Sequence, residues 1–386
     1  MKVYSFGKLS DGRTAGLYIL KNANGMEVSI TDYGATIVSL VVPDKNGKYR
    51  DVVLGHDDVS GYENGHGSIG AVVGRFANRI CGAKVEIGGK TYELTANHGP
   101  NTLHGGRDFY NKRLWEAKIQ FGQIKSNEIY KVSALESLND RWPSSVQENI
   151  TGDSVTFCLD SPDGDQGFPG NLHIEVTYTL TENDELNIDY RAVSDSDTPL
   201  NLTNHSYFNL NGDSCPTVLD QICQIRADGF TPNDEFCLPT GEIRSVGGTP
   251  FDFREPKPLG QDINEDDVQL KFGGGYDHNF VIATRDELEQ FDETGGKLSF
   301  KEAASLYAAD SGIKMTVMTD LPGVQLYTAN GMNDHTGKRG ASYGPRGSVC
   351  FETQFWPDAV TKENFPGGIL RAGEEFVSRT TYKFEY

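Results

Sequence analysis

The sequence lacks any long hydrophobic run. Its first residues, MKVYSFGKLSDGR, contain no apolar core of signal-peptide length, and the longest apolar patch, residues 35–43, is interrupted by Thr36 and Ser39. A membrane-crossing helix needs about 20 consecutive apolar residues, and a signal peptide needs an apolar central region. We therefore expect neither a membrane partner nor a secretory route.

Cysteine is sparse, and basic residues are outnumbered. The six cysteines include no CxxC pair and no dense cluster; they are Cys81, Cys158, Cys215, Cys223, Cys237 and Cys350. This distribution predicts free thiols in a reducing compartment, and hence a cytoplasmic protein. The 55 acidic and 35 basic side chains give a formal net charge of −20. Such a surface repels phosphate backbones and anionic lipid, which argues against nucleic acid or membrane as a partner and suits a neutral ligand.

Several catalytic and cofactor motifs are also missing. No GxGxxG follows a strand-like segment, and there is no Walker loop, HExxH pair or GxSxG elbow. His98 and His104 lie six positions apart, which is not a convincing spacing for a metal pair. These absences predict a protein with no nucleotide, no metal and no other cofactor.

Alternating apolar and polar residues are abundant. In residues 173–180 the apolar positions share one face, and after a polar turn the same alternation resumes in residues 186–190, which predicts a hairpin. A second hairpin is predicted at residues 83–94, where Gly88 and Gly89 supply the positive φ angles of a tight turn. Residues 313–319 and 324–327 are also strand-like.

Helical patterns are few, and only residues 258–267 and 286–292 are predicted to hold a turn or two of helix. The 44 glycines suit many short strands joined by turns, so we expect an all-β protein built of antiparallel strands, a sandwich or barrel. No internal repeat and no low-complexity linker stands out in the sequence. The polar, weakly patterned stretch at about residues 121–153 is interpreted as a surface insertion.

Polar groups with glycine and aromatic neighbours recur along the chain. His205 lies in NLTNHSYFNLNG, among hydroxyls, amides and aromatic rings, and Glu352 lies in FETQFWP, where an unpaired charge would be costly. Each residue alone fits a structural role at least as well as a functional one. Together, amide, guanidinium, imidazole, carboxylate and aromatic groups are what sugar hydroxyls and ring faces require.

These segments carry a resemblance to a known family. GRFANRI, NTLHGG, NLTNHSYFNLNG, TPFDF, GYDHNF, LPGVQLYTAN and ETQFWPDA occur in the order, and near the spacing, of the galactose mutarotase (aldose 1-epimerase) family. The similarity covers nearly the whole chain except the insertion. Small departures are Phe355-Trp356, where the family often has His-Phe, and Thr361, where Asn is frequent.

The resemblance implies that residues 1–386 form a single domain, a large antiparallel β-supersandwich with a sugar cleft. It also implies an enzyme that interconverts the anomers of free aldoses such as glucose and galactose. His205 corresponds to the family's general acid and Glu352 to its general base. The implied substrate-binding residues are Asn78, Arg79, His104, Ser206, Tyr207, Asp277 and Gln325. A monosaccharide is the implied partner, and the chain is expected to be a monomer or weak homodimer.

Three other functions fit parts of the same pattern. A glycoside hydrolase would use two carboxylates, which Asp277 and Glu352 could supply. A non-catalytic sugar-binding protein could share the fold, because fold does not determine function. An enzyme for sugar phosphates would need more basic residues than Arg79 and Arg75 near the cleft, and the negative net charge also disfavours it.

Overall fold

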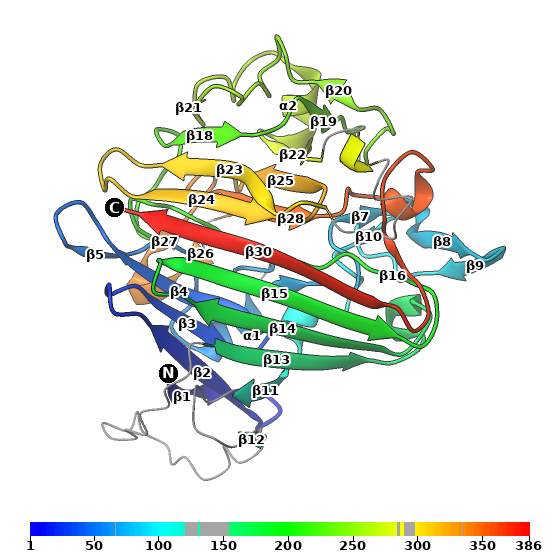
Figure 1. The fold of residues 1–386 in the computed structure, drawn as a ribbon, viewed down its shortest axis with the longest axis horizontal. Coiled ribbons are helices and arrows are strands. Elements are labelled where there is room, and N and C mark those ends of the chain that lie inside the picture. The colour runs from blue at the N-terminus through cyan, green and yellow to red at the C-terminus, as the bar shows by residue number, and fades with distance from the viewer. Residues whose placement is uncertain (66, 120–129, 132–153, 284–285, 289–297, 334) are drawn as a thin grey trace.

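Antiparallel β-sheet dominates the structure, a computed structural model that describes residues 1–386 except 66, 120–129, 132–153, 284–285, 289–297 and 334 (Figure 1). Three large sheets carry most of the chain. Every pairing between described strands is antiparallel, whereas the isolated bridge between Phe76 and Asn201 is parallel. The predicted all-β class is thus confirmed.

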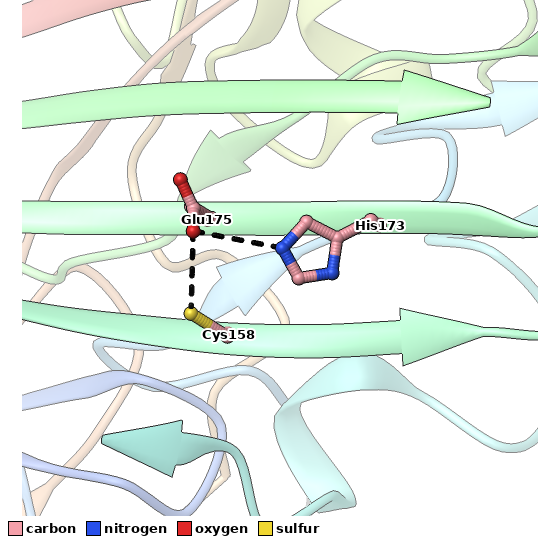
Figure 2. Close-up of side chains that lie close together, drawn as sticks. All are labelled: Cys158, His173 and Glu175. Carbon is pink, nitrogen blue, oxygen red and sulfur yellow. Dashed lines mark hydrogen bonds and ion pairs between the residues drawn. The ribbon is translucent and has the colours of Figure 1, made fainter. Parts of the chain in front are cut away.

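The widest sheet has ten strands and crosses the front of the molecule in Figure 1. In order across the sheet they are β12 (Tyr130–Lys131), β11 (Glu116–Ile119), β13 (Ser154–Ser161), β14 (Leu172–Leu180), β15 (Glu185–Ser194), β30 (Glu375–Glu385), β24 (Lys314–Thr319), β23 (Lys301–Tyr307), β18 (Ile222–Ile225) and β21 (Lys257–Pro258). Alternate residues of β14 face the core or solvent, as period-two side-chain placement requires. On the solvent face, His173 and Glu175 of β14 project beside Cys158 of β13 (Figure 2).

Two five-stranded sheets complete the main architecture. The first runs β1 (Lys2–Lys8), β2 (Thr14–Lys21), β3 (Glu27–Thr31), β4 (Thr36–Pro43) and β5 (Tyr49–Asp51). The second runs β20 (Arg244–Ser245), β19 (Gly229–Thr231), β22 (Asp277–Val281), β25 (Gly323–Tyr327) and β28 (Cys350–Gln354).

Short ladders and, in the described part of the chain, two six-residue helices connect the sheets. The ladders pair β6 (Val72–Val73) with β17 (Thr203–Asn204), β7 (Arg79–Ile80) with β10 (Thr102–Leu103), β8 (Lys84–Ile87) with β9 (Lys90–Glu93), β16 (Thr198–Pro199) with β29 (Ile369–Leu370), and β26 (His335–Thr336) with β27 (Ser342–Tyr343). The helices are α1 (Val59–Asn64) and α2 (Val268–Gly273). No helix in the described part of the chain is long and apolar enough to span a membrane.

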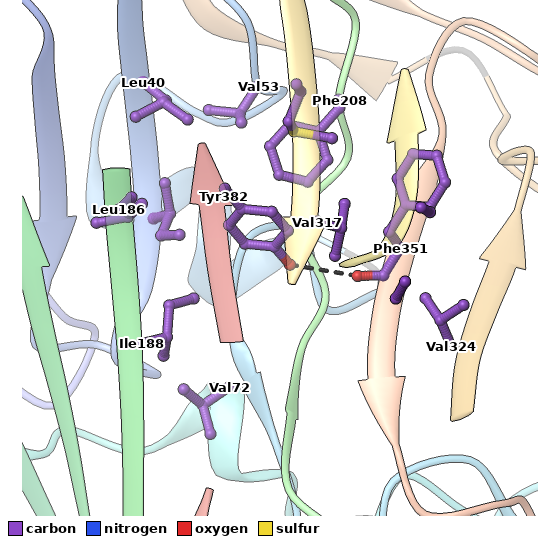
Figure 3. Packing of buried hydrophobic residues seen from close by; sticks show 14 of the residues in the cluster. Leu40, Val53, Val72, Leu186, Ile188, Phe208, Val317, Val324, Phe351 and Tyr382 are labelled. Carbon is purple, nitrogen blue, oxygen red and sulfur yellow. Dashed lines mark hydrogen bonds between the residues drawn. The ribbon is translucent and has the colours of Figure 1, made fainter. Parts of the chain in front are cut away.

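One buried apolar cluster joins the three large sheets. Figure 3 shows Leu186 and Ile188 of β15 and Val317 of β24 facing the same interior as Leu40 of β4 and Val324 of β25. Figure 3 also labels Val53, Val72, Phe208, Phe351 and Tyr382 of the same cluster. The Tyr382 hydroxyl also donates a hydrogen bond of 3.2 Å to the Phe351 carbonyl, which ties the ten-stranded sheet to β28. Apolar burial and this bond fix β28 in place.

The strand predictions are confirmed, and one helix prediction is wrong. Strands β14 and β15 form the first predicted hairpin, and β8 and β9 form the second, with φ values of 59° and 76° at Gly88 and Gly89. Pro258 ends β21 and residues 259–266 form turns and bends, so α2 begins only at Val268, after its cap Asp267. Residues 286–288 are helical, whereas 289–292 lie outside the described residues. The predicted insertion at about residues 121–153 also lies outside the described residues, except for β12.

Candidate active site

A cleft of about 390 Å³ opens where the short ladders meet the second five-stranded sheet. It is lined by Gly65, Gly67, Ser68, Asn78, Arg79, Leu103, His104, Phe109, Lys112, His205, Tyr207, Asp277, Tyr327 and Glu352. Pockets for small organic ligands usually have volumes of about 300–1,000 Å³, so this cleft suits one small molecule.

The β7–β10 ladder supplies Asn78, Arg79 and His104 to one wall. Leu103 pairs with Arg79, and the residues beside the ladder, Asn78 and His104, have positive φ angles of 62° and 52°. The backbone N–H of Asn78 donates to His104 Nδ1 at 3.2 Å, so that nitrogen is the unprotonated one. His104 Nε2 then carries the proton, which makes this imidazole a hydrogen-bond donor.

His205 follows β17 and is held by backbone bonds on both sides. Its N–H donates to the Ala71 carbonyl, and its carbonyl accepts from the Gly70 N–H, both at 2.9 Å. The ring stacks on Tyr207, with centroids 4.9 Å apart and planes 16° apart, and meets Tyr327 and His104 edge to face. Three aromatic rings therefore set the orientation of the imidazole.

Glu352 lies in the middle of β28, directly opposite Gln325 of β25. The residue is only 2% exposed and His205 only 6%, yet both side chains line the cleft. Glu352 Oε1 lies 3.6 Å from His205 Nε2. Within the described part of the chain, Glu352 Oε2 and His205 Nδ1 have no hydrogen-bond partner. A buried polar atom without a partner is costly, and a polar ligand in the cleft could supply one.

Burial shifts the protonation of both groups toward their neutral forms. Desolvation, followed by the charge of Asp277, raises the pKa of Glu352 to about 8, and the Arg79 guanidinium opposes that rise. Desolvation also lowers the pKa of His205 to about 4. Near neutral pH the pair therefore holds one proton, on the carboxyl group. Transfer across the 3.6 Å gap would produce an imidazolium and a carboxylate with the same total number of protons.

Asp277 forms the cleft wall at the start of β22, and Gln325 supports it from behind. Gln325 Nε2 donates to Asp277 Oδ1 at 2.7 Å, while its Oε1 accepts from Gln354 Nε2 at 3.2 Å. Burial raises the pKa of Asp277, and Arg79 lowers it. Asp277 thus lines the cleft with one carboxylate oxygen already bonded to the protein.

Seven of the nine residues singled out from the sequence line the cleft. They are Asn78, Arg79, His104, His205, Tyr207, Asp277 and Glu352. Ser206 and Gln325 are buried and do not line it. Gln325 contacts Asp277 instead, and Ser206 Oγ has no hydrogen-bond partner among the described residues.

The sequence reasoning missed several lining residues, notably Tyr327, Ser68 and Lys112. Tyr327 could have been found, because it lies two positions after Gln325 on a strand and so shares its face. Nothing in the local sequence singles out Lys112. Its ammonium donates to the carbonyls of Tyr62 and Gly65, and so holds the loop after α1 beside the cleft.

The cleft can bind hydroxyl groups and move protons. It combines a guanidinium, a neutral imidazole donor, two buried carboxyl groups and aromatic rings. Among the described residues, no three cleft side chains bring metal-ligand atoms within 4.8 Å of one another. The arrangement therefore suits acid–base chemistry on a neutral, hydroxyl-rich molecule.

Comparisons with known proteins agree with this chemistry. The sequence model of the aldose 1-epimerase family matches residues 16–383. A galactose mutarotase from Bos taurus is 38% identical over 98% of this chain and 97% of its own length. An aldose 1-epimerase from Escherichia coli is 35% identical over 97% and 96%. The crystal structure of an aldose epimerase homologue from C. elegans has a TM-score of 0.77 at 31% identity, covering 96% of this chain and 99% of that one.

Proposed function

Because this chain belongs to the aldose 1-epimerase family, we propose that it is an aldose mutarotase, an isomerase that interconverts the α and β anomers of free aldoses such as glucose and galactose. The observation that carries the proposal is the proximity of His205 Nε2 and Glu352 Oε1, 3.6 Å apart in a cleft of monosaccharide size. The reaction breaks and re-forms one bond with no redox change and no group transfer. The reaction therefore requires one general acid and one general base.

In the proposed mechanism, Glu352 removes the proton from the anomeric hydroxyl while His205 protonates the ring oxygen. The bond between the anomeric carbon and the ring oxygen breaks, which gives an open-chain aldehyde. Rotation about the adjacent carbon–carbon bond presents the other carbonyl face, and closure returns both protons. A net proton thus moves from His205 to Glu352 on opening and back on closing.

The protonation of the buried pair suits this cycle. Ring opening leaves a neutral imidazole and a protonated carboxyl group, which is the state that burial favours. The ring-closed sugar needs the charged form, and Arg79 favours the Glu352 carboxylate by lowering its pKa. The uncharged pair would thus accompany the uncharged aldehyde, so no isolated charge is left in a desolvated cleft.

The remaining residues are proposed to hold the sugar. Arg79 and the Nε2–H of His104 would donate to sugar oxygens, and the ring oxygen is the one that gains negative character as the bond breaks. Asn78, Tyr207 and Asp277 would bind hydroxyls. Gln325 is proposed to act by fixing the Asp277 carboxylate, and Ser206 by presenting its neighbours His205 and Tyr207.

The decisive experiment is polarimetry of freshly dissolved α-glucose and α-galactose, corrected for the spontaneous rate. Wild-type protein should accelerate the approach to equilibrium. His205→Ala and Glu352→Gln should each lose about 10²–10⁴-fold in kcat, the usual contribution of a positioned acid or base. An Arg79→Ala variant should raise KM as well as lower kcat. Wild-type turnover in either His205→Ala or Glu352→Gln would remove the role proposed for that residue.

A glycoside hydrolase is the second candidate, because Asp277 and Glu352 both line the cleft. Release of nitrophenol from an aryl glycoside, lost on Asp277→Asn, would favour it. A non-catalytic sugar binder on the same fold would bind aldoses without changing the rate of mutarotation. The proximity of an acid and a base favours the epimerase over the binder, because binding alone requires neither.

We also propose that the chain is a single-domain cytoplasmic protein, monomeric or weakly dimeric. One core cluster with members from all three large sheets supports a single domain. All six cysteines are free thiols, which supports a reducing compartment. Sedimentation analysis across a range of concentrations would test the oligomeric state.

A further inference from the structure

A second cluster of chemically competent side chains lies on the solvent face of the ten-stranded sheet. Cys158 and Asp160 lie two residues apart on β13, and His173 and Glu175 two residues apart on β14. The register pairs Cys158 with Glu175 and Asp160 with His173, so the four residues are neighbours on one face of the two strands. Figure 2 shows three of them, Cys158, His173 and Glu175. The opposite face of these strands carries Phe157 and Ile174 of the core, which separates the cluster from the sugar cleft.

Three side chains of this cluster bring potential metal ligands close together. Cys158 Sγ, His173 Nε2 and a Glu175 oxygen all lie within 4.8 Å of one another. Glu175 Oε1 is 3.6 Å from His173 Nε2 and 3.8 Å from Cys158 Sγ. Bonds of about 2.0–2.3 Å at tetrahedral angles place the nitrogen and oxygen ligands of zinc about 3.4 Å apart, and the sulfur and oxygen ligands about 3.6 Å apart. For these two pairs shifts of about 0.2 Å would suffice, whereas the sulfur and nitrogen ligands, which lie within 4.8 Å of each other, would have to come to about 3.6 Å.

The surrounding residues already orient two of the three ligands. Asp160 Oδ1 lies 2.6 Å from His173 Nδ1, which leaves Nε2 directed at Glu175. A carboxylate on the far nitrogen is the usual partner of a metal-binding histidine, because it fixes the tautomer and raises the basicity of the ligating nitrogen. Arg191 Nη1 donates to Glu175 Oε2 at 3.2 Å, so Oε1 is the oxygen turned toward the cluster.

We propose that Cys158, His173 and Glu175 bind one Zn²⁺ ion on the solvent face of the ten-stranded sheet, with water as the fourth ligand. Mixed sulfur, nitrogen and oxygen ligands in a tetrahedral arrangement favour zinc over magnesium or calcium. Binding releases the Cys158 thiol proton to solvent, and the resulting thiolate and the Glu175 carboxylate balance the two charges of the ion.

Lys118 would compete with the zinc ion for one of its ligands. Lys118 of β11 places its ammonium 2.9 Å from Glu175 Oε1, the same oxygen that the metal would take. The Lys118 side chain is partly exposed and flexible, so it can swing into solvent when the ion binds. Lys118 therefore acts as a built-in competitor, and its removal should tighten binding.

Titration of the full-length protein with Co²⁺, a spectroscopic substitute for Zn²⁺, tests the site. Wild-type protein should bind one equivalent, with intense visible absorption typical of tetrahedral cobalt and a thiolate-to-cobalt charge-transfer band. Zn²⁺ should displace the cobalt and raise Tm, because a ligand that binds only the folded state stabilises it. Saturating galactose should change neither spectrum nor stoichiometry, which distinguishes this site from metal held in the cleft.

Matched variants give the sharper test. Competition against a chromophoric chelator should show that Asp160→Asn weakens Zn²⁺ binding about 10–100-fold. Cys158→Ser and His173→Gln should weaken it further and abolish the charge-transfer band or alter it, whereas Lys118→Met should tighten it. Cys81→Ser, which removes an exposed thiol elsewhere, should bind like wild type. Mutarotation by the variants should remain at the wild-type rate.

The proposal fails if wild-type protein binds no stoichiometric Co²⁺, or if Cys158→Ser and His173→Gln both bind as wild type does. It fails equally if Cys81→Ser abolishes the spectrum or galactose displaces the metal. Because His173 is half-exposed, His173→Gln keeps the test valid even if Cys158→Ser disturbs packing. None of these outcomes depends on the reaction proposed for the cleft.

Discussion

At the scale of single residues, desolvation controls the protonation of the cleft pair. The pKa of His205 falls to about 4 and that of Glu352 rises to about 8. Below the first value the pair gains a second proton and no base remains. Above the second value it loses its only proton and no acid remains. We therefore expect kcat/KM to follow a bell-shaped curve that is highest between about pH 4 and pH 8.

The measurement is polarimetry from pH 3.5 to 9.5, with the buffer-catalysed rate subtracted at each pH. The descending limb should be lost, along with most activity, in Glu352→Gln. A wild-type rate that continues to rise through pH 9 would contradict the assignment of the last proton to this pair.

The raised pKa of Glu352 also makes the free energy of unfolding depend on pH. Its folded-state pKa is raised from 4.5 to about 8, so between these values the folded protein holds a proton that the unfolded chain has released. Stability conferred by this proton is complete below about pH 4.5 and is lost as the pH rises toward 8. Glu352→Gln keeps the shape and cannot ionise. It should therefore gain stability over wild type as the pH rises, by at most about 1.4 kcal/mol for each unit of pKa shift.

Denaturant midpoints of both proteins at pH 5 and pH 8 check this expectation. The difference between the two proteins should be small at pH 5 and large at pH 8, whatever other groups titrate in both. Equal midpoints at both values would show that Glu352 has a nearly normal pKa in the folded state.

At the scale of elements, local sequence predicted strands better than helices. The β14–β15 and β8–β9 hairpins were predictable because alternation and a Gly-Gly turn are local signals. Helix α2 was misplaced because its start depends on one side chain: Asp267 accepts from the N–H groups of Gln269 at 2.7 Å and Leu270 at 3.3 Å. The acidic residues before it looked like part of the helix but form the turn that precedes it.

The Asp267 cap contributes to stability. Asp267→Ala should lower the free energy of unfolding by about 0.5–2 kcal/mol, because two N–H groups lose their acceptor. Asp267→Asn should keep most of the wild-type stability, because an asparagine side chain can accept the same hydrogen bonds. The neighbouring Asp266→Ala is the matched control, since Asp266 is exposed and pairs with Lys271 at the surface rather than capping the helix. Thermal unfolding of the three variants checks the expectation. If Asp266→Ala and Asp267→Ala lowered the stability equally, the effect would come from the loss of a negative charge rather than from the loss of the cap.

At the scale of the whole molecule, the candidate site could be predicted residue by residue but not in space. The family motifs identified His205 and Glu352, which are 147 positions apart. Their proximity depends on contacts that no local pattern encodes, such as the hydrogen bonds from Tyr382 to Phe351 and between the Thr353 and Thr380 hydroxyls, which join β28 to β30. Ser206 and Gln325 share motifs with cleft residues, yet neither lines the cleft. Gln325 lies on the same face of the sheet as Glu352, but its amide is hydrogen-bonded to the Asp277 carboxylate.

Net charge is the other property of the whole chain, and it predicts the response to salt. With 55 acidic and 35 basic side chains, repulsive pairs outnumber attractive ones at pH 7. The many exposed ion pairs weaken in salt, but each is worth only about 0–1 kcal/mol. Raising the ionic strength from about 0.01 to 0.15 M shortens the screening length from about 30 to 8 Å, which weakens long-range repulsion most. We therefore expect Tm to rise with NaCl at pH 7.

Calorimetry at the two ionic strengths, repeated near pH 5, separates this effect from others. The sequence pI is about 4.8, so at pH 5 the net charge is small and the salt-induced rise in Tm should nearly vanish. A preferential-exclusion effect of the salt would raise Tm at both pH values alike. A fall in Tm with salt at pH 7 would mean that the surface ion pairs outweigh the repulsion among the 20 excess carboxylates.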